Sequence, residues 1–162
     1  MGVASTGRDG SLLGTMRTSI ATSLLLALTA CQSAPETTSA GFVSLERGSQ
    51  TGLGTVGLRV ATTPDDWVAL WREHARLQLP QPAAPTVDFS RYRPALVLAG
   101  PRPSGGYSIA VERVHYTGGK LVVEARERVP QAGSVQTMAL TSPYEVVLLP
   151  AGTVEVDFVV RH

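Results

Sequence analysis

One cysteine stands where its sulfur could undergo covalent chemistry. Cys31, the single cysteine of the chain, follows Leu28-Thr29-Ala30 and a short apolar stretch at 20–28, with Arg17 before that stretch. A basic start, a brief apolar segment and small residues before a cysteine are typical of a bacterial lipoprotein signal, in which lipid is attached to that cysteine. The segment is far shorter than the ~20 residues of a membrane-spanning helix. We therefore expect a signal peptide at 1–30 and a lipid anchor at Cys31.

The residues after Cys31 predict a flexible tether at 31–40. They contain no large apolar side chain, so they cannot offset the entropy lost when a backbone becomes ordered. The alternative interpretation, a buried Cys31 thiol at the end of an N-terminal helix, fits this composition poorly. Gln32 stands where an aspartate would favour the inner membrane, so the sorting rule favours an outer-membrane address in a bacterium with two membranes. The predicted location is the bacterial cell envelope.

Histidine and carboxylate residues form no recognisable catalytic set. His74, His115 and His162 are widely spaced, and the folded part contains no Gly-x-Ser-x-Gly, His-Glu-x-x-His or Ser-x-x-Lys motif. Glu73 beside His74 has no second histidine at helical spacing, which leaves a metal site without ligands. Helix capping explains Asp65-Asp66. We expect a protein that is not an enzyme and that carries no metal and no cofactor.

Charge and cysteine content narrow the partners further. Lys and Arg number 14 and Asp and Glu 13, and Arg8, Asp9 and Arg17 precede Cys31, so the mature part is balanced in charge. A nucleic-acid partner would require clustered positive charge, so we expect none. With one cysteine the exported domain has no internal disulfide, and its core must stabilise it unaided.

A capped helix is predicted after the first strands. Thr63 supplies the capping hydroxyl, Pro64 suits the first helical position, and the helix should run to about Leu77. Trp67, Leu70, Trp71 and His74 then share one face. The two tryptophans could form a sugar-binding platform, but their spacing beside Leu70 favours a stripe that packs on a sheet.

Alternating or continuous apolar residues predict strands on both sides of this helix. The pair around Thr117-Gly118-Gly119 should form a hairpin with a bulge near Glu112-Arg113, and a second hairpin should turn at 150–152. The continuous apolar run at 95–100 suits a central strand. The predicted strands are 42–47, 56–61, 95–100, 107–116, 120–128, 144–149 and 154–160. Together they predict one α+β domain at 41–162, a mostly antiparallel β-sheet with one packed helix.

Several of these segments carry a resemblance to a known family. The string Gly100-Pro101-Arg102-Pro103-Ser104-Gly105-Gly106-Tyr107-Ser108-Ile109, the strand at 120–126 and the stretch at 136–144 resemble the C-terminal domain of the PrcB family, and the similarity extends from Trp67 to Val159. The family takes its name from a lipoprotein subunit of a surface protease complex, associated there with protease assembly and stability. The resemblance implies a non-catalytic accessory protein of the cell envelope, with an envelope protein such as a protease as its partner.

Two loops, at 100–107 and at 142–144, contain the candidate partner-binding residues. Gly105 and Gly106 can adopt positive φ and the flanking prolines stiffen the loop, so Arg102 could be presented to a partner or could bind loop carbonyls. A chagasin-like proteinase inhibitor is the alternative function, because both loops faintly resemble that family's, although the helix is foreign to an immunoglobulin-like sandwich. The candidates are Arg102, Pro103, Gly105, Gly106, Tyr107, Pro143 and Tyr144.

Overall fold

The computed structural model describes residues 36–162, so the predicted signal peptide and Cys31 lie outside the described residues. The single helix in this range, α1 (Pro64–His74), follows three strands and precedes five. The strands are β1 (Thr38–Ala40), β2 (Val43–Gly48), β3 (Gly57–Val60), β4 (Tyr92–Leu98), β5 (Ser108–Thr117), β6 (Lys120–Arg128), β7 (Tyr144–Pro150) and β8 (Val156–Arg161). No helix in this range is long and apolar enough to cross a membrane.

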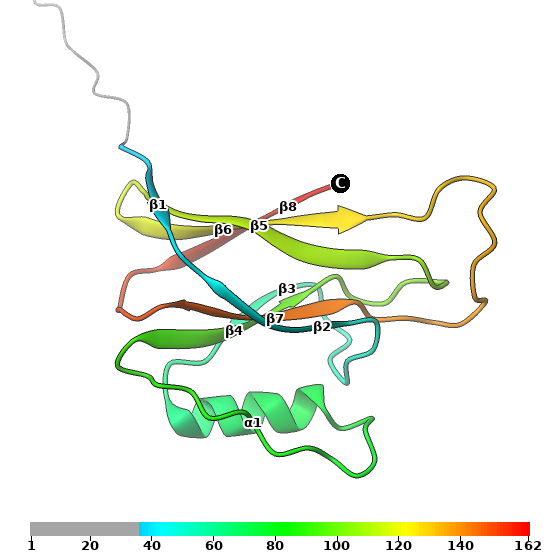
Figure 1. The fold of residues 1–162 in the computed structure, drawn as a ribbon, viewed down its shortest axis with the longest axis horizontal. Coiled ribbons are helices and arrows are strands. Elements are labelled where there is room, and N and C mark those ends of the chain that lie inside the picture. Colours follow the sequence, from blue (N-terminus) through cyan, green and yellow to red (C-terminus); the bar gives the residue numbers. More distant parts are fainter. Residues whose placement is uncertain (1–35) are drawn as a thin grey trace, which may run out of the picture. The chain divides into compact units, whose positions relative to one another are not determined.

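The strands form two sheets rather than the one expected, and α1 packs on the outer face of one of them (Figure 1). One sheet has the order β1-β5-β6-β8 and the other the order β2-β7-β4-β3. All neighbours pair antiparallel except β6 and β8, which are parallel. The predicted α+β class, with one helix and mostly antiparallel strands, is confirmed.

The predicted hairpin at 150–152 is wrong. β7 lies between β2 and β4, so both of its edges are already paired when the chain reaches Pro150. A fully buried strand needs partners on both sides, and here β2 and β4 provide them. The turn therefore carries the chain into the other sheet, where β8 joins the free edge of β6 in parallel. The alternation in β8 is still as predicted, with Val156 and Phe158 packed against the core.

The predicted tether also ends earlier than expected. Residues 38–40 form β1, which pairs with β5 in the register Thr38↔Tyr116. The prediction considered side chains alone, whereas the backbone of this segment forms ladder hydrogen bonds with an edge that would otherwise be open. Gly41 and Phe42 then lead into β2 of the opposite sheet, so β1 and β2 together close one side of the sandwich.

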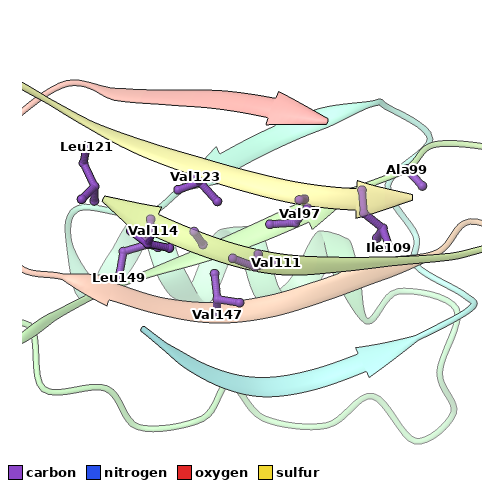
Figure 2. Close-up of a cluster of buried hydrophobic side chains, with 11 residues drawn as sticks. Val97, Ala99, Ile109, Val111, Val114, Leu121, Val123, Val147 and Leu149 are labelled. Carbon is purple, nitrogen blue, oxygen red and sulfur yellow. The ribbon is translucent and has the colours of Figure 1, made fainter. Parts of the chain in front are cut away.

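The main core fills the space between the two sheets (Figure 2). Inward side chains of β4, β5, β6 and β7 supply it, among them Val97, Val123 and Leu149, which are fully buried. The bulge predicted at Glu112-Arg113 is confirmed, because the register of β5 against β6 shifts between Val111 and Arg113. The bulge therefore keeps apolar residues inward on both sides of a change in parity.

A second apolar cluster lies under α1. The Thr63 side chain accepts a hydrogen bond from the Asp66 amide, which confirms the predicted cap, and the helix ends at His74 rather than Leu77. Trp67 and Trp71 are buried, with ring centroids 5.3 Å apart, so the prediction of a core stripe is confirmed. Gly52 donates its amide to the His74 carbonyl at 2.7 Å and packs against the helix end.

Candidate functional site

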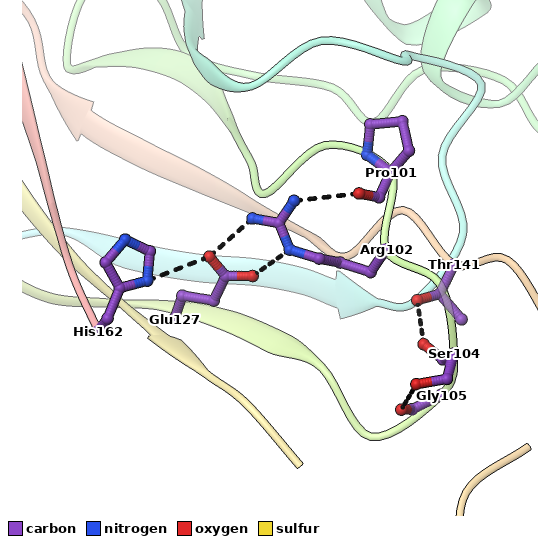
Figure 3. A network of polar contacts seen from close by, with 7 residues as sticks. All are labelled: Pro101, Arg102, Ser104, Gly105, Glu127, Thr141 and His162. Atoms are coloured by element: carbon purple, nitrogen blue, oxygen red, sulfur yellow. Dashed lines mark hydrogen bonds and ion pairs between the residues drawn. The ribbon is translucent and has the colours of Figure 1, made fainter.

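The first candidate loop is held against a distant part of the chain. The 100–107 loop connects β4 to β5 and lies beside residues 137–142, which lead into β7 (Figure 3). Arg102 and Thr141 exchange backbone hydrogen bonds of 2.8 and 3.0 Å, and the Gly105 amide donates to the Thr137 carbonyl at 2.9 Å. The Thr141 hydroxyl donates to the Ser104 carbonyl at 2.8 Å. These bonds hold both segments at one end of the sandwich.

Arg102 is anchored by a carboxylate that the sequence analysis did not single out. Its Nε and Nη2 donate to the two oxygens of Glu127 at 2.5 and 2.7 Å, and its Nη1 donates to the Pro101 carbonyl at 3.0 Å (Figure 3). The hydrogen bond to Glu127 raises the pKa of Arg102. His162 Nδ1 lies 3.5 Å from the same carboxylate. Arg102 therefore fixes the loop to β6. Only its bond to the Pro101 carbonyl lies within the loop, so the alternative in which it binds loop carbonyls describes that one bond and not its main partner.

A pattern in β6 could have revealed Glu127. Leu121, Val123 and Ala125 are buried on one face of the strand, and Glu127 follows at the same parity with its side chain only 3% exposed. A carboxylate on a buried face requires a cationic partner. Arg102, two residues after the apolar run at 95–100, is that partner. The end of β4 and the end of β6 face each other across the core, which brings Arg102 close to Glu127.

A small cavity adjoins this ion pair. Its volume is about 220 Å³, and Arg102, Glu127 and His162 line it together with Val56, Ile109 and Val160. Its wall is partly apolar and partly formed by these three charged or ionisable side chains, which already bind one another. It can accommodate a small side chain, and it is not a deep substrate pocket.

Three strongly exposed apolar side chains lie beyond this end of the fold. The connection from β6 to β7 extends past the strands (Figure 1), and Val135, Met138 and Leu140 on it are 99%, 91% and 76% exposed. Pro103 is exposed and Tyr107 partly so on the adjoining loop. We call these five residues the loop-end surface. Sequence reasoning missed its apolar half because the 129–140 segment has no strand or helix periodicity.

Gly106 shows why one of the two predicted loop glycines is needed. Its φ is +83°, a conformation that other residues rarely adopt, and a Cβ there would lie 2.1 Å from the Gln136 side chain. Gly105 has ordinary backbone angles and a Cβ there would meet Thr137 at 3.4 Å. The expected positive φ is therefore present at Gly106 and not at Gly105. The contact at Gly105 is an ordinary one, so the structure does not require a glycine there.

Pro143 and Tyr144 lie away from that surface. Both are buried, and Tyr144 begins β7 under α1 with its ring centroid 4.4 Å from that of His74. Its hydroxyl donates to Glu46. Burial raises the pKa of Tyr144, and the bond to Glu46 adds to the effect. The hypothesis that these two residues rim a binding surface is therefore dropped in favour of the alternative, a strand start with a packed tyrosine.

His74 belongs to the same buried layer. Its Nδ1 lies 2.9 Å from the Thr51 hydroxyl, and both residues are buried. Burial lowers the pKa of His74, opposed in part by the negative charge of Glu46. No cluster of three His, Cys, Asp or Glu side chains suited to a metal ion occurs among residues 36–162.

Comparison with known proteins bears on the segment that contains this loop. No curated protein and no solved structure matches the chain. The stretch from Ala95 in β4 to Pro150 at the end of β7 includes Arg102, Glu127 and the loop-end surface, and it is narrower than the similarity noted from Trp67 to Val159. Residues 95–150 match the family model described as PrcB C-terminal, which confirms the resemblance seen in the sequence.

Proposed function

We propose that this protein is a lipid-anchored accessory protein of the bacterial cell envelope that holds a partner protein at its loop-end surface. The observation that carries this proposal is the strong exposure of Val135, Met138 and Leu140 on one connection, which lies beside a loop fixed by Arg102. Exposed apolar groups that cluster next to rigid polar groups are typical of protein interfaces. A protease working outside the cytoplasm is the class of partner that the PrcB resemblance implies.

The direction of the strands suits an anchored binding protein. Thr38 pairs with Tyr116 beside the turn between β5 and β6, whereas Ser108 pairs with Arg128 at the other end of the same strands. The chain therefore enters the sheet at the end opposite the loop-end surface. With lipid on Cys31, upstream of β1, that surface would be the end farther from the anchor and accessible to a partner.

Partner retention tests the surface. The acylated protein is crosslinked in its own membranes and recovered with its partner, and the double variant Met138→Glu and Leu140→Glu is compared with Leu79→Glu. Leu79 is 93% exposed and lies after α1, outside the proposed surface. We expect the double variant to lose the partner and Leu79→Glu to retain it. Equal recovery from both would contradict the proposal.

The anchor has its own test. Cys31→Ser should move the protein from the membrane to the soluble fraction, and mass spectrometry of the wild type should find an acylated N-terminal cysteine at position 31. An unacylated N-terminus before residue 31 would contradict the anchor, whatever the result for the partner.

One observation favours the alternative of a chagasin-like inhibitor. The segments 100–107 and 137–142 lie side by side at one end of a two-sheet sandwich, an arrangement that could occupy a protease cleft. Pro143 and Tyr144, on which that similarity also rested, are buried and cannot reach a protease. Papain is a suitable probe. Inhibition of papain by the wild type, lost in the double variant, would replace the accessory role with an inhibitory one.

A further inference from the structure

A larger cavity lies at the other end of the fold. Its volume is about 610 Å³, within the range of ligand pockets in proteins. The apolar part of its wall comes from Val60, Phe89, Val154 and Val156, and the polar part includes Thr62 and Arg93. Arg93 in its wall lies near the start of β4, whereas the 100–107 loop follows the opposite end of that strand.

Arg93 carries a buried positive charge in this wall. The residue is 6% exposed, its Nε donates to the Pro150 carbonyl at 3.1 Å, and its Nη1 donates to the Val154 carbonyl at 3.0 Å. Its Nη2 is buried without a hydrogen-bond partner, and no carboxylate of residues 36–162 forms an ion pair with it. A buried guanidinium without a counter-charge is strongly unfavourable. An anion bound at this guanidinium would supply the counter-charge.

The two strands beside the cavity indicate which class of anionic ligand would fit it. Val60 belongs to β3 and Val156 to β8, and each of these strands forms one edge of its sheet. An edge strand offers unpaired backbone amides and carbonyls, which an extended peptide can bind and a plain acyl chain cannot. The valines would receive its apolar side chains.

We propose that this cavity binds the C-terminal carboxylate of an extended apolar peptide, with Arg93 donating hydrogen bonds to that carboxylate and the edge of β3 or β8 as the backbone partner. The site is independent of the loop-end surface. A peptide bound here would supply the charge that Arg93 lacks, through charge-assisted hydrogen bonds that are about twice as strong as neutral ones.

A matched pair of peptides tests this assignment. The probes are an acetylated valine-threonine-valine-leucine-valine pentapeptide with a free C-terminal carboxylate and the same peptide with a C-terminal amide, titrated calorimetrically into the complete chain. We expect the free acid to bind at least about tenfold more tightly than the amide, the factor that one charge-assisted bond contributes. Equal affinity, or no binding of either, would overturn the proposal.

A variant that should fold well separates the site from general stability. Val154→Glu places a carboxylate on the cavity wall beside Arg93, so it should weaken binding of the free acid at least about tenfold and raise the melting temperature. Val129→Glu is the control, because Val129 directly follows β6, is 61% exposed and does not line the cavity. This variant should bind the acid as the wild type does. Unweakened binding by Val154→Glu would refute the role of Arg93.

Two further measurements identify the source of the carboxylate and the independence of the site. Decanoate presents the same charge on an apolar chain without backbone amides, so binding of decanoate together with failure of the peptide acid would overturn the peptide assignment. The double variant Met138→Glu and Leu140→Glu should bind the peptide acid normally. Failure of partner retention and failure of peptide binding are thus distinguishable.

Discussion

Glu145 should be the side chain on which the pairing of the two sheets depends most. It is completely buried on β7, and its Oε2 accepts the Val111 amide of β5 at 2.5 Å, across the core in the other sheet. Its Oε1 accepts from the Ser44 hydroxyl and from Arg47 Nη2, both at 2.6 Å. Val111 sits where the bulge interrupts the ladder, so Glu145 binds the donor that the bulge releases.

The substitution Glu145→Gln keeps the size of the side chain and removes its charge. The amide oxygen can still accept from Val111, and the Ser44 hydroxyl can turn to accept from the new NH₂ group. Arg47 can only donate, so it loses its bond, but it is half-exposed and can move into water. Hydrogen bonds to charged groups contribute about 1.5 to 3 kcal/mol and neutral ones about 1 kcal/mol. A neutral amide costs less to bury than a carboxylate, which offsets part of this loss. We therefore expect the free energy of unfolding to fall by about 2 to 3 kcal/mol.

Thermal unfolding and amide hydrogen exchange measure this effect. A loss of that size corresponds to a melting temperature lower by roughly 5 to 10 °C, and exchange of the Val111 amide should accelerate more than that of its neighbours. Glu112→Gln is the matched control, since it removes an exposed carboxylate of the same bulge that pairs with Arg126 at the surface. Surface pairs contribute at most about 1 kcal/mol. Equal melting temperatures for the two variants would refute the role assigned to Glu145.

Three other perturbations follow from the same structure. Trp71→Ala should lower the free energy of unfolding by about 3 to 5 kcal/mol, because the ring is buried and its Nε1 donates to the Pro82 carbonyl. Val68→Ala, on the exposed face of the same helix, serves as the control. An unchanged melting temperature of Trp71→Ala would show that the ring is not packed. Burial lowers the pKa of His74, so the folded state favours the neutral imidazole. The free energy of unfolding is therefore unaffected by this group above pH 6.5 and decreases as the pH falls from 6.5 toward the lowered pKa. Melting temperatures of His74→Asn, measured against pH, should lack this decrease. Arg102→Ala should cost about 2 to 4 kcal/mol, since it leaves the buried Glu127 carboxylate with His162 alone; urea unfolding measures this, and a loss below about 0.5 kcal/mol would show that the pair is solvated.

The local elements could be predicted from the sequence because local chemistry specifies them. Thr63 before Pro64 fixes the start of α1, and the change in parity along β5 requires the bulge. The partition into two sheets depends on which strand edges are already occupied, and that is a property of the whole chain. The second hairpin was predicted from the turn residues at 150–152, which say nothing of the pairing of β7 with β2 and β4.

The candidate site divides in the same way. Loop rigidity and the position of Arg102 could be inferred from prolines and glycines that act over a few residues. The apolar half of the loop-end surface could not, because exposure depends on what fails to cover Met138 and Leu140 in three dimensions. Pro143 and Tyr144 were misplaced for the opposite reason. Nothing near them in the chain indicates that α1 and its His74 lie above them.

The buried charges of this fold support the case for a ligand at Arg93 when they are compared. Glu145 and Glu127 are both buried, and each is bound by an arginine from another strand or loop. Arg93 is buried to a similar degree, yet two backbone carbonyls are its partners and one of its nitrogens has none. If the fold tolerated uncompensated charge, the two carboxylates would not have acquired such close partners. The exception therefore indicates a group that completes the site, and the acid and amide peptides differ in that group alone.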